Sequence, residues 1–253
     1  MDSINNKPVW AKSKDEIWRE VFEPVVEHSY GKGLWSRIPV WGYAASLLIP
    51  VLLMCHFYTV TEETSRGEHT VVSLPDRSTV TMNAESKLTY KPLEWFISKK
   101  VTLKGEAFFE VNPGRQFCVQ SGRARVQVLG TTFNVYARAE KYRITCLTGR
   151  VEVHTGSESV VLNPNMQAVF NENMNIISDV VSSTATGWIQ GKFVFVKTPL
   201  QEVIAEVERQ YNITVVPGNY PNHLYSGIFL KMDKPEDVLE VIGKPFDITF
   251  SIE

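Results

Sequence analysis

The sequence predicts a mainly β protein with a single transmembrane helix, an all-β region built as a sandwich or β-roll, and a small α+β module of βαββαβ order. Three observations predict this class. The run 38–60 is apolar and contains no Asp, Glu, Lys or Arg. Short segments of alternating apolar and polar residues fill 61–180, with the period of half-buried strands. Residues 187–253 instead interleave helical spacing with strand-like runs.

The run Ile38–Val60 is long enough to cross a bilayer, since about 20 apolar residues span the hydrocarbon. Aromatic residues lie near both ends, as in interfacial belts: Trp41, Tyr43, Phe57 and Tyr58. Basic residues precede the run, at Lys7, Lys12, Lys14, Arg19, Lys32 and Arg37, whereas Glu62, Glu63 and Glu68 follow it. By the positive-inside rule, residues 1–37 are cytoplasmic and the longer part lies outside. The alternatives are a core helix, which would rarely stay uncharged over this length, and a cleaved signal peptide, whose charged region would be unusually long.

Residues 1–37 contain one predicted short helix. Ser13 and Glu16 have the spacing of a capping box, in which each side chain satisfies an unpaired amide at a helix start. An apolar stripe follows, formed by Ile17, Trp18, Val21 and Phe22. A segment this small cannot bury its own core, and aromatic residues dominate binding hot spots. We therefore expect the stripe to bind a partner protein; a frayed juxtamembrane anchor is the alternative.

Charge and motif content argue against several functional classes. The formal net charge is −2 and no basic stripe is present, so direct nucleic-acid binding is not expected. The histidines follow no metal-binding pattern, and no phosphate loop, nucleophile elbow or cysteine pair occurs; we expect no enzyme, metal or cofactor. Glu106 and Glu110 share one side of a predicted strand, which we interpret as a solvated face. Cys118 and Cys146 form either a disulfide or two buried thiols.

Turn residues separate the strand-like segments of 61–180. The segments are 70–74, 79–82, 87–90, 100–103, 124–129, 133–136, 142–145 and 151–153, and the turns fall at Pro75-Asp76, Asn112-Pro113-Gly114, Gly130, Thr148-Gly149 and Asn163-Pro164-Asn165. Many short strands with frequent turns indicate a sandwich, a barrel or a stacked β-roll. The pattern does not choose among these three.

Two blocks, 101–111 and 128–135, together with 74–83, resemble the FecR-type periplasmic domain of membrane-bound sigma-factor regulators. The residues that carry the resemblance are Leu74, Pro75, Asp76, Leu103, Gly105, Glu106, Ala107, Phe108, Phe109, Val111, Leu129, Gly130, Thr131, Phe133 and Val135. We interpret them as mostly structural. Gly105 permits a bulge or a close backbone approach. Phe108 and Phe109 point to opposite faces, so at least one should belong to the core.

The chain departs from this family pattern at two turns and in its N-terminal segment. Arg77 stands where the family usually has Gly; if that position needs a positive φ, Arg costs about 1–2 kcal/mol. Asn163-Pro164-Asn165 replaces a usual Pro-Gly turn, and Asn tolerates the left-handed region best among non-glycines. The cytoplasmic segment is also shorter than is common in the family.

Residues 187–253 show a new pattern. Strands are predicted at 193–196, 213–216, 225–230 and 246–252. One helix begins after Thr198, its expected cap, with Pro199 at its first position; the second begins at 233–236 and ends at Gly243. This order resembles the small domain fused to Bacteroidetes FecR-type proteins and the short domains of secretins and TonB-dependent receptors. The resemblance implies a protein-interaction unit whose strand edges accept a partner strand. Trp188 and Gly191 are expected to form a structural joint before it.

The resemblance implies an anti-sigma factor of the bacterial inner membrane, with its C-terminus in the periplasm. Such proteins relay a signal from an outer-membrane TonB-dependent transducer to a cytoplasmic extracytoplasmic-function (ECF) sigma factor. The transducer's signalling domain would bind the outer modules, with or without regulated proteolysis, and the stripe Ile17, Trp18, Val21 and Phe22 would contact the sigma factor. The alternative is a membrane-anchored module that binds glycan or peptidoglycan, for which Tyr90, Trp95 and Phe96 form the only plausible aromatic platform.

Overall fold

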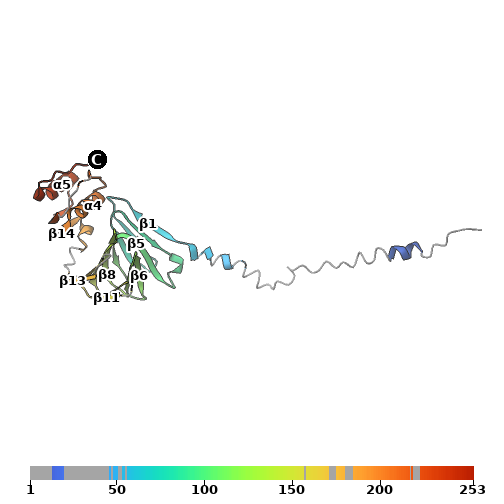
Figure 1. The fold of residues 1–253 in the computed structure, drawn as a ribbon. Helices are drawn as coiled ribbons and strands as arrows, with labels where there is room; N and C mark the ends of the chain where they lie inside the picture. Colours follow the sequence, from blue (N-terminus) through green and yellow to red (C-terminus); the bar gives the residue numbers. More distant parts are fainter. Residues whose placement is uncertain are drawn as a thin grey trace, which may run out of the picture. The chain divides into compact units, whose positions relative to one another are not determined.

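The structure, a computed structural model, describes residues 13–19, 46, 48–50, 53–54, 56–156, 158–170, 175–179, 185–216, 218 and 223–253. The chain divides into two compact units, Met1–Met54 and Cys55–Glu253. Figure 1 shows their elements coloured along the sequence. We describe each unit separately.

The first unit contains the predicted short helix, of which residues 14–19 are described. The capping box is confirmed: the Ser13 amide donates to Glu16 Oε2 at 2.8 Å, and the Glu16 amide donates to Ser13 Oγ at 3.2 Å. Ile17 and Trp18 are exposed. Val21 and Phe22 lie outside the described residues.

The predicted span Ile38–Val60 lies mostly outside the described residues, although its described positions 46, 48–50, 53–54 and 56–57 are helical. Within the described part of the chain, no helix has both the length and the apolar character needed to cross a membrane. The predicted end of the span is wrong by a few residues. Val60 begins strand β1 and pairs with Tyr90, so its backbone bonds to a neighbouring strand rather than to a preceding helical turn.

The described residues of the β domain form thirteen strands and one short 3-10 helix. They are β1 (Val60–Thr64), β2 (Thr70–Ser73), β3 (Thr79–Met82), β4 (Ser86–Tyr90), η2 (Pro92–Glu94), β5 (Lys99–Glu110), β6 (Phe117–Ser121), β7 (Ala124–Val128), β8 (Thr132–Arg138), β9 (Lys141–Thr148), β10 (Val151–Thr155), β11 (Glu158–Leu162), β12 (Met166–Phe170) and β13 (Asn175–Asp179). β5 is the shared element: its first half pairs with β4 and β6, and its second half pairs with β3 and β8. The strands therefore form two sheets joined through β5.

Gly105 lies where β5 passes from one sheet to the other. Its φ of 102° is a conformation that favours glycine. A Cβ at this position would lie 2.8 Å from Ser86 Cα, so the close backbone approach predicted from the sequence is confirmed. A strand that bends between two sheets is a known way to close a sandwich.

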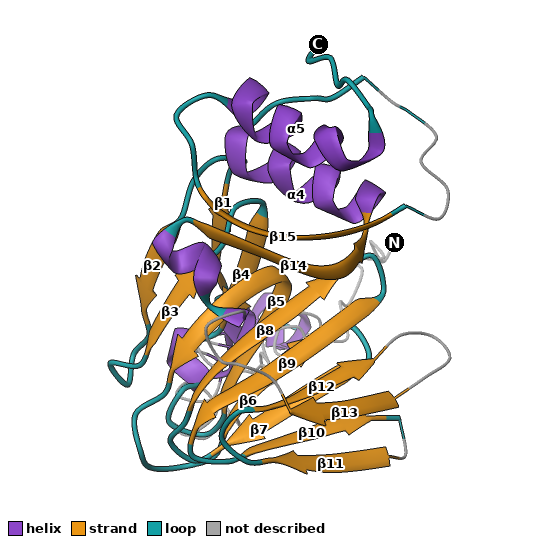
Figure 2. Ribbon diagram, turned by 90° about the vertical axis from the view of Figure 1, so that its left-hand side faces the viewer, coloured by secondary structure: helices purple, strands orange, loops and turns teal. Residues whose placement is uncertain are grey.

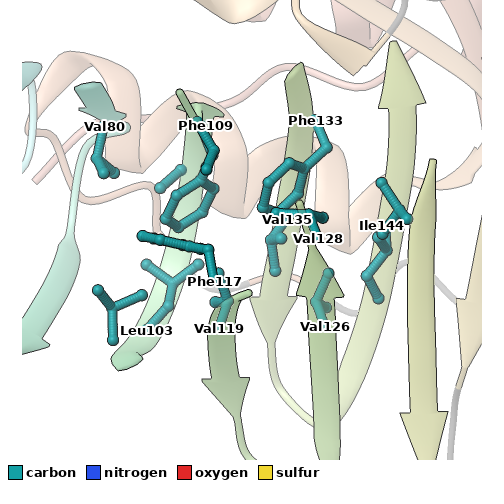
Figure 3. Close-up of a cluster of buried hydrophobic side chains, with 14 of the residues drawn as sticks. Val80, Leu103, Phe109, Phe117, Val119, Val126, Val128, Phe133, Val135 and Ile144 are labelled. Carbon is teal, nitrogen blue, oxygen red and sulfur yellow. The ribbon is translucent and has the colours of Figure 1, made fainter. Parts of the chain in front are cut away.

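The core lies between the two sheets and is contributed by both (Figure 3). Phe109 and Phe133 stack with ring centroids 4.9 Å apart. Phe117, from the other sheet, makes an edge-to-face contact with Phe109 at a centroid distance of 6.2 Å. Phe109 is fully buried and Phe108 is only half-buried, as their opposite directions on the strand predict.

Cys118 and Cys146 are both free thiols, so the disulfide alternative is wrong. Burial raises the pKa of Cys146 to about 11.

Both unusual turns adopt positive φ. Arg77 has a φ of 64° and Asn165 a φ of 67°, so the condition under which Arg77 is strained is met, and Asn165 occupies the left-handed region that Asn tolerates. The Arg77 amide donates to the Leu74 carbonyl at 2.8 Å, which closes the turn between β2 and β3. Because Arg77 has a Cβ, its backbone carries a strain in this conformation that glycine would avoid.

The C-terminal module contains η3 (Gly187–Gln190), β14 (Lys192–Pro199), α4 (Leu200–Tyr211), β15 (Leu224–Leu230), α5 (Pro235–Gly243) and η4 (Lys244–Phe246). Figure 2 shows the two helices on one side of the β14–β15 pair. Its core combines the apolar sides of α4 and α5 with Phe193, Tyr225 and Phe229.

Two expectations for this module are wrong. The strands predicted at 213–216 and 246–252 are reduced to one bridge between Val215 and Ile252. Phe246 instead ends the 3-10 helix Lys244–Phe246, and Asp247 follows it with a φ of 57°. Thr198 does not cap α4: it belongs to β14, and the N-cap residue is Pro199, which makes no side-chain cap hydrogen bond.

Candidate functional site at the junction of the β domain and the C-terminal module

A buried carboxylate, Glu106, lies at the centre of the junction. Alternation along β5 directs it away from the sandwich core, on the same side as Glu110. Glu106 Oε1 accepts a hydrogen bond from Asn134 Nδ2, and Oε2 accepts one from Asn83 Nδ2, both at 2.8 Å. Burial, with the nearby Glu206 carboxylate adding to it, raises the pKa of Glu106. The interpretation of this strand face as solvated is therefore wrong for Glu106, although Glu110 is exposed.

Gln210, from α4 of the C-terminal module, reaches into this cluster. Its Nε2 donates to Asn83 Oδ1 at 2.6 Å and to Glu206 Oε1 at 2.9 Å. Its Oε1 lies 3.1 Å from His69 Nε2. The Gln210 side chain is buried. One amide of the C-terminal module thus joins two polar side chains of the β domain.

Ion pairs surround this cluster. Glu85 Oε2 lies 3.1 Å from Arg209 Nε, and Glu85 Oε1 lies 3.1 Å from Arg66 Nε. Burial alone would raise the pKa of Glu85, but the two guanidinium groups hold that pKa below its ordinary value. The Gly67 amide also donates to the Arg209 carbonyl at 2.8 Å. The end of α4 is therefore held by both the backbone and the side chains of the β domain.

Trp188 and His69 form an aromatic contact across the same junction, with ring centroids 5.2 Å apart and planes at 83°. Trp188 is buried, whereas His69 stays partly open to solvent. Desolvation of the His69 ring at the junction lowers its pKa. Gly191 ends η3 with a φ of 65° and turns the chain into β14. The structure thus places the two residues expected to form a joint at the boundary between the modules.

A cavity of about 260 Å³ lies beside the cluster and is lined by both modules, including Glu106, Asn134 and Arg143 of the β domain and Trp188 and Glu206 of the C-terminal module. Arg143 lies over the Tyr136 ring, 4.2 Å from its centroid. Among the described residues, no group of three or more His, Cys, Asp or Glu side chains is placed to hold a metal ion. The arrangement holds two modules together through a buried polar network.

The two modules match two family models. The model described as FecR protein matches residues 60–152, and the model described as FecR, C-terminal, matches residues 192–253. A crystal structure of a candidate anti-sigma factor from Parabacteroides distasonis ATCC 8503 is 31% identical, with a TM-score of 0.72, and the match covers 78% of this chain and 95% of that chain. The chain belongs to the FecR family. A second structure from the same organism, with the same description, has 29% identity and a TM-score of 0.70, covering 77% of this chain and 98% of that chain. A comparison with curated proteins gives no match.

In this FecR-family chain, most of the residues that carry the family resemblance are buried. Leu74, Leu103, Glu106, Ala107, Phe109, Val111, Thr131, Phe133 and Val135 are all buried. Gly130 has a φ of 153°, and a Cβ there would lie 2.6 Å from Pro113 Cα. Asp76 forms an ion pair with Lys99 at 2.8 Å. Leu129, with 65% of its surface exposed, and Pro75 are the two exposed members of the set.

The aromatic platform considered for glycan binding does not form. Trp95 is buried in the core of this FecR-family protein, where it contacts Tyr90 and Phe117 with ring centroids 5.9 Å away in each case. Phe96 is exposed, whereas Tyr90 is half-buried and packs against the core. The rings of Tyr90 and Trp95 therefore pack against the core and do not form a platform with Phe96.

Sequence reasoning missed Asn83, Asn134, Gln210 and His69 as junction residues. One signal was present: Gln210 lies three positions after Val207 on the apolar side of α4, where a polar residue must find a buried partner. The two Asn residues carried no such signal, because each occupies a strand or turn position that reads equally well as exposed.

Proposed function

We propose that the chain is a single-pass inner-membrane anti-sigma factor that relays a signal from an outer-membrane TonB-dependent transducer to a cytoplasmic ECF sigma factor. The family membership of both modules supports a regulatory role. The proposed binding of the sigma factor rests on the capped helix at residues 14–19, which presents Ile17 and Trp18 to solvent ahead of the apolar run. An exposed Trp on a short helix has the chemistry of a binding hot spot.

The transducer-binding half is assigned to the C-terminal module. β14 and β15 pair only with each other among the described residues, so each has an outer edge available for strand addition. Ile228 and Leu230 on β15 are 66% and 67% exposed and would lie beside an added strand. The junction described above then connects a partner on β15 to the β domain through α4.

The test uses the full-length chain and the ECF sigma factors of the same cell. We expect the chain to capture one sigma factor selectively, and Trp18→Ala with Phe22→Ala to abolish that capture. Lys14→Ala, on the same helix outside the apolar stripe, is the matched control and should retain it. If the double variant binds and represses as well as the parent chain, the sigma contact has been placed on the wrong residues.

The second arm probes β15 with the signalling domain of a TonB-dependent transducer. Ile228→Asp with Leu230→Asp should weaken binding of that domain without changing sigma capture. Val71→Asp, a change of an equally exposed apolar residue on β2, should leave both interactions intact. Transducer binding that survives the β15 changes would remove the strand-addition model.

A further inference from the structure

An apolar tip projects from the β domain between β4 and β5. Phe96 and Ile97 are 85% and 80% exposed, and Leu93 is half-exposed. Neighbouring Trp95 is turned inward to the core, so the segment is anchored while its apolar side chains point outward. Contiguous exposed apolar residues of this kind mark protein or membrane contact sites.

A basic groove of about 380 Å³ begins at this tip. It is lined by Ile97, Lys99, Lys100, Arg115 and Arg125, and no carboxylate lines it. The Arg115 guanidinium donates to the carbonyls of Phe96 and Ile97, so the groove and the tip form one surface. Lys99 is paired with Asp76. Within the described part of the chain, Lys100, Arg115 and Arg125 form no ion pair with a carboxylate.

The tip lies where the chain enters the β domain from the apolar run 38–60. Val60, the first residue of β1, pairs with Tyr90, just before η2. His56 Nδ1 lies 2.6 Å from Glu94 Oε1 within η2. If the run spans the bilayer as proposed, these contacts place the tip and the groove at the outer surface of that bilayer.

We propose that the tip and the groove together dock on an anionic lipid surface. Leu93, Phe96 and Ile97 enter the boundary between headgroups and acyl chains, where aromatic and aliphatic side chains are favoured. Lys100, Arg115 and Arg125 bind the lipid phosphates, as basic residues beside a membrane anchor do. Charge complementarity and the connection to the predicted span select a membrane over a protein partner. This inference rests on the membrane anchor of the proposed function.

The experiment uses residues 56–253, which carry two apolar cores of their own. The related crystal structures match this chain over 95% and 98% of their own chains but over only 78% and 77% of this one, so a part of the chain without its N-terminal segment is expected to fold alone. Sedimentation is measured with vesicles of phosphatidylcholine alone and of phosphatidylcholine with phosphatidylglycerol in equal parts. We expect binding to the second only, weakened by added salt because exposed charges are screened.

Two variants and a matched control decide the outcome. Lys100→Glu with Arg125→Glu should weaken vesicle binding at least about tenfold, and Phe96→Ser with Ile97→Ser should do the same with the charge unchanged. Lys234→Glu with Lys244→Glu alters the net charge equally on exposed positions of the C-terminal module and should bind as the parent does. Equal binding to both vesicle types, no binding by the parent, or equal loss in the control would overturn the inference. Sigma capture by the full-length chain is measured separately, so a failure here with capture intact removes the docking surface alone.

Discussion

Gln210 Nε2 donates a 2.6 Å hydrogen bond to Asn83 Oδ1, and this bond links the C-terminal module to the β domain. Asn83 in turn donates to Glu106, so three buried side chains from α4, the end of β3 and β5 form one chain of hydrogen bonds. A buried polar network is stable only when each member is satisfied. The junction should therefore respond sharply to the loss of any one group.

Replacing Gln210 with Ala should loosen the junction. The change removes the donor to Asn83 Oδ1 and should cost about 1–3 kcal/mol, because the buried Asn83 side chain is left unsatisfied. Hydrogen exchange should show faster opening of residues 200–211 while the sandwich core stays protected. Gln201→Ala, an exposed position on the same helix, is the control and should change neither stability nor exchange.

Two substitutions at Glu106 should differ. Glu106→Ala removes the acceptor of two buried amides and should lower the free energy of unfolding by about 2–4 kcal/mol. Glu106→Gln should be milder. Its oxygen can still accept from Asn83 Nδ2, and once the Asn134 amide turns over, its nitrogen can donate to Asn134 Oδ1, a buried atom without a partner among the described residues. Urea unfolding of both variants checks the order, and equal losses would show that the carboxylate's charge matters more than its shape.

The same carboxylate sets one part of the pH dependence. The pKa of Glu106 is raised above its ordinary value of 4.5, so the folded chain retains a proton that the unfolded chain releases above that pH. Its contribution to stability is complete below pH 4.5 and is lost as pH rises through the raised pKa. Glu106→Gln should remove this decline in unfolding midpoints, and an unchanged profile would contradict the raised pKa.

His69 should contribute a pH dependence of stability opposite in sign to that of Glu106. Its pKa is lowered from 6.5, so the unfolded chain binds the proton first as the solution is acidified. Its contribution is complete above pH 6.5 and is lost as pH falls toward the lowered pKa. His69→Gln should flatten the profile below pH 6.5. A profile that His69→Gln leaves unchanged below pH 6.5 would contradict the lowered pKa of His69.

Arg77→Gly should stabilise the chain. Arg77 has a φ of 64°, which costs a residue with a Cβ about 1–2 kcal/mol; glycine avoids this but loses roughly 0.5–1 kcal/mol through its larger unfolded entropy. The net gain should be up to about 1.5 kcal/mol in thermal unfolding. Arg77→Ala retains the Cβ and should give no gain, so a similar gain in both variants would point to the Arg charge instead of the backbone.

Local rules predicted most turns and strands because they depend on neighbouring residues. The close approach at Gly105 followed from a glycine within a strand, whereas only the structure shows the positive φ of Arg77, which the sequence makes conditional. The strands predicted at 213–216 and 246–252 do not form, because a strand also needs a pairing partner and, of these residues, only Val215 and Ile252 pair.

The sequence by itself determined the capped N-terminal helix, the alternating strands, the family and the buried side of α4, since periodicity and turn chemistry are written in adjacent positions. Only the tertiary structure decided that Glu106 is buried and that Trp95 is no binding platform. The reason is physical: alternation tells which face of β5 a side chain occupies, but not what covers that face. Glu106 is covered by a module whose contact residue Gln210 lies 127 positions from Asn83, and such a distant partner leaves no local pattern.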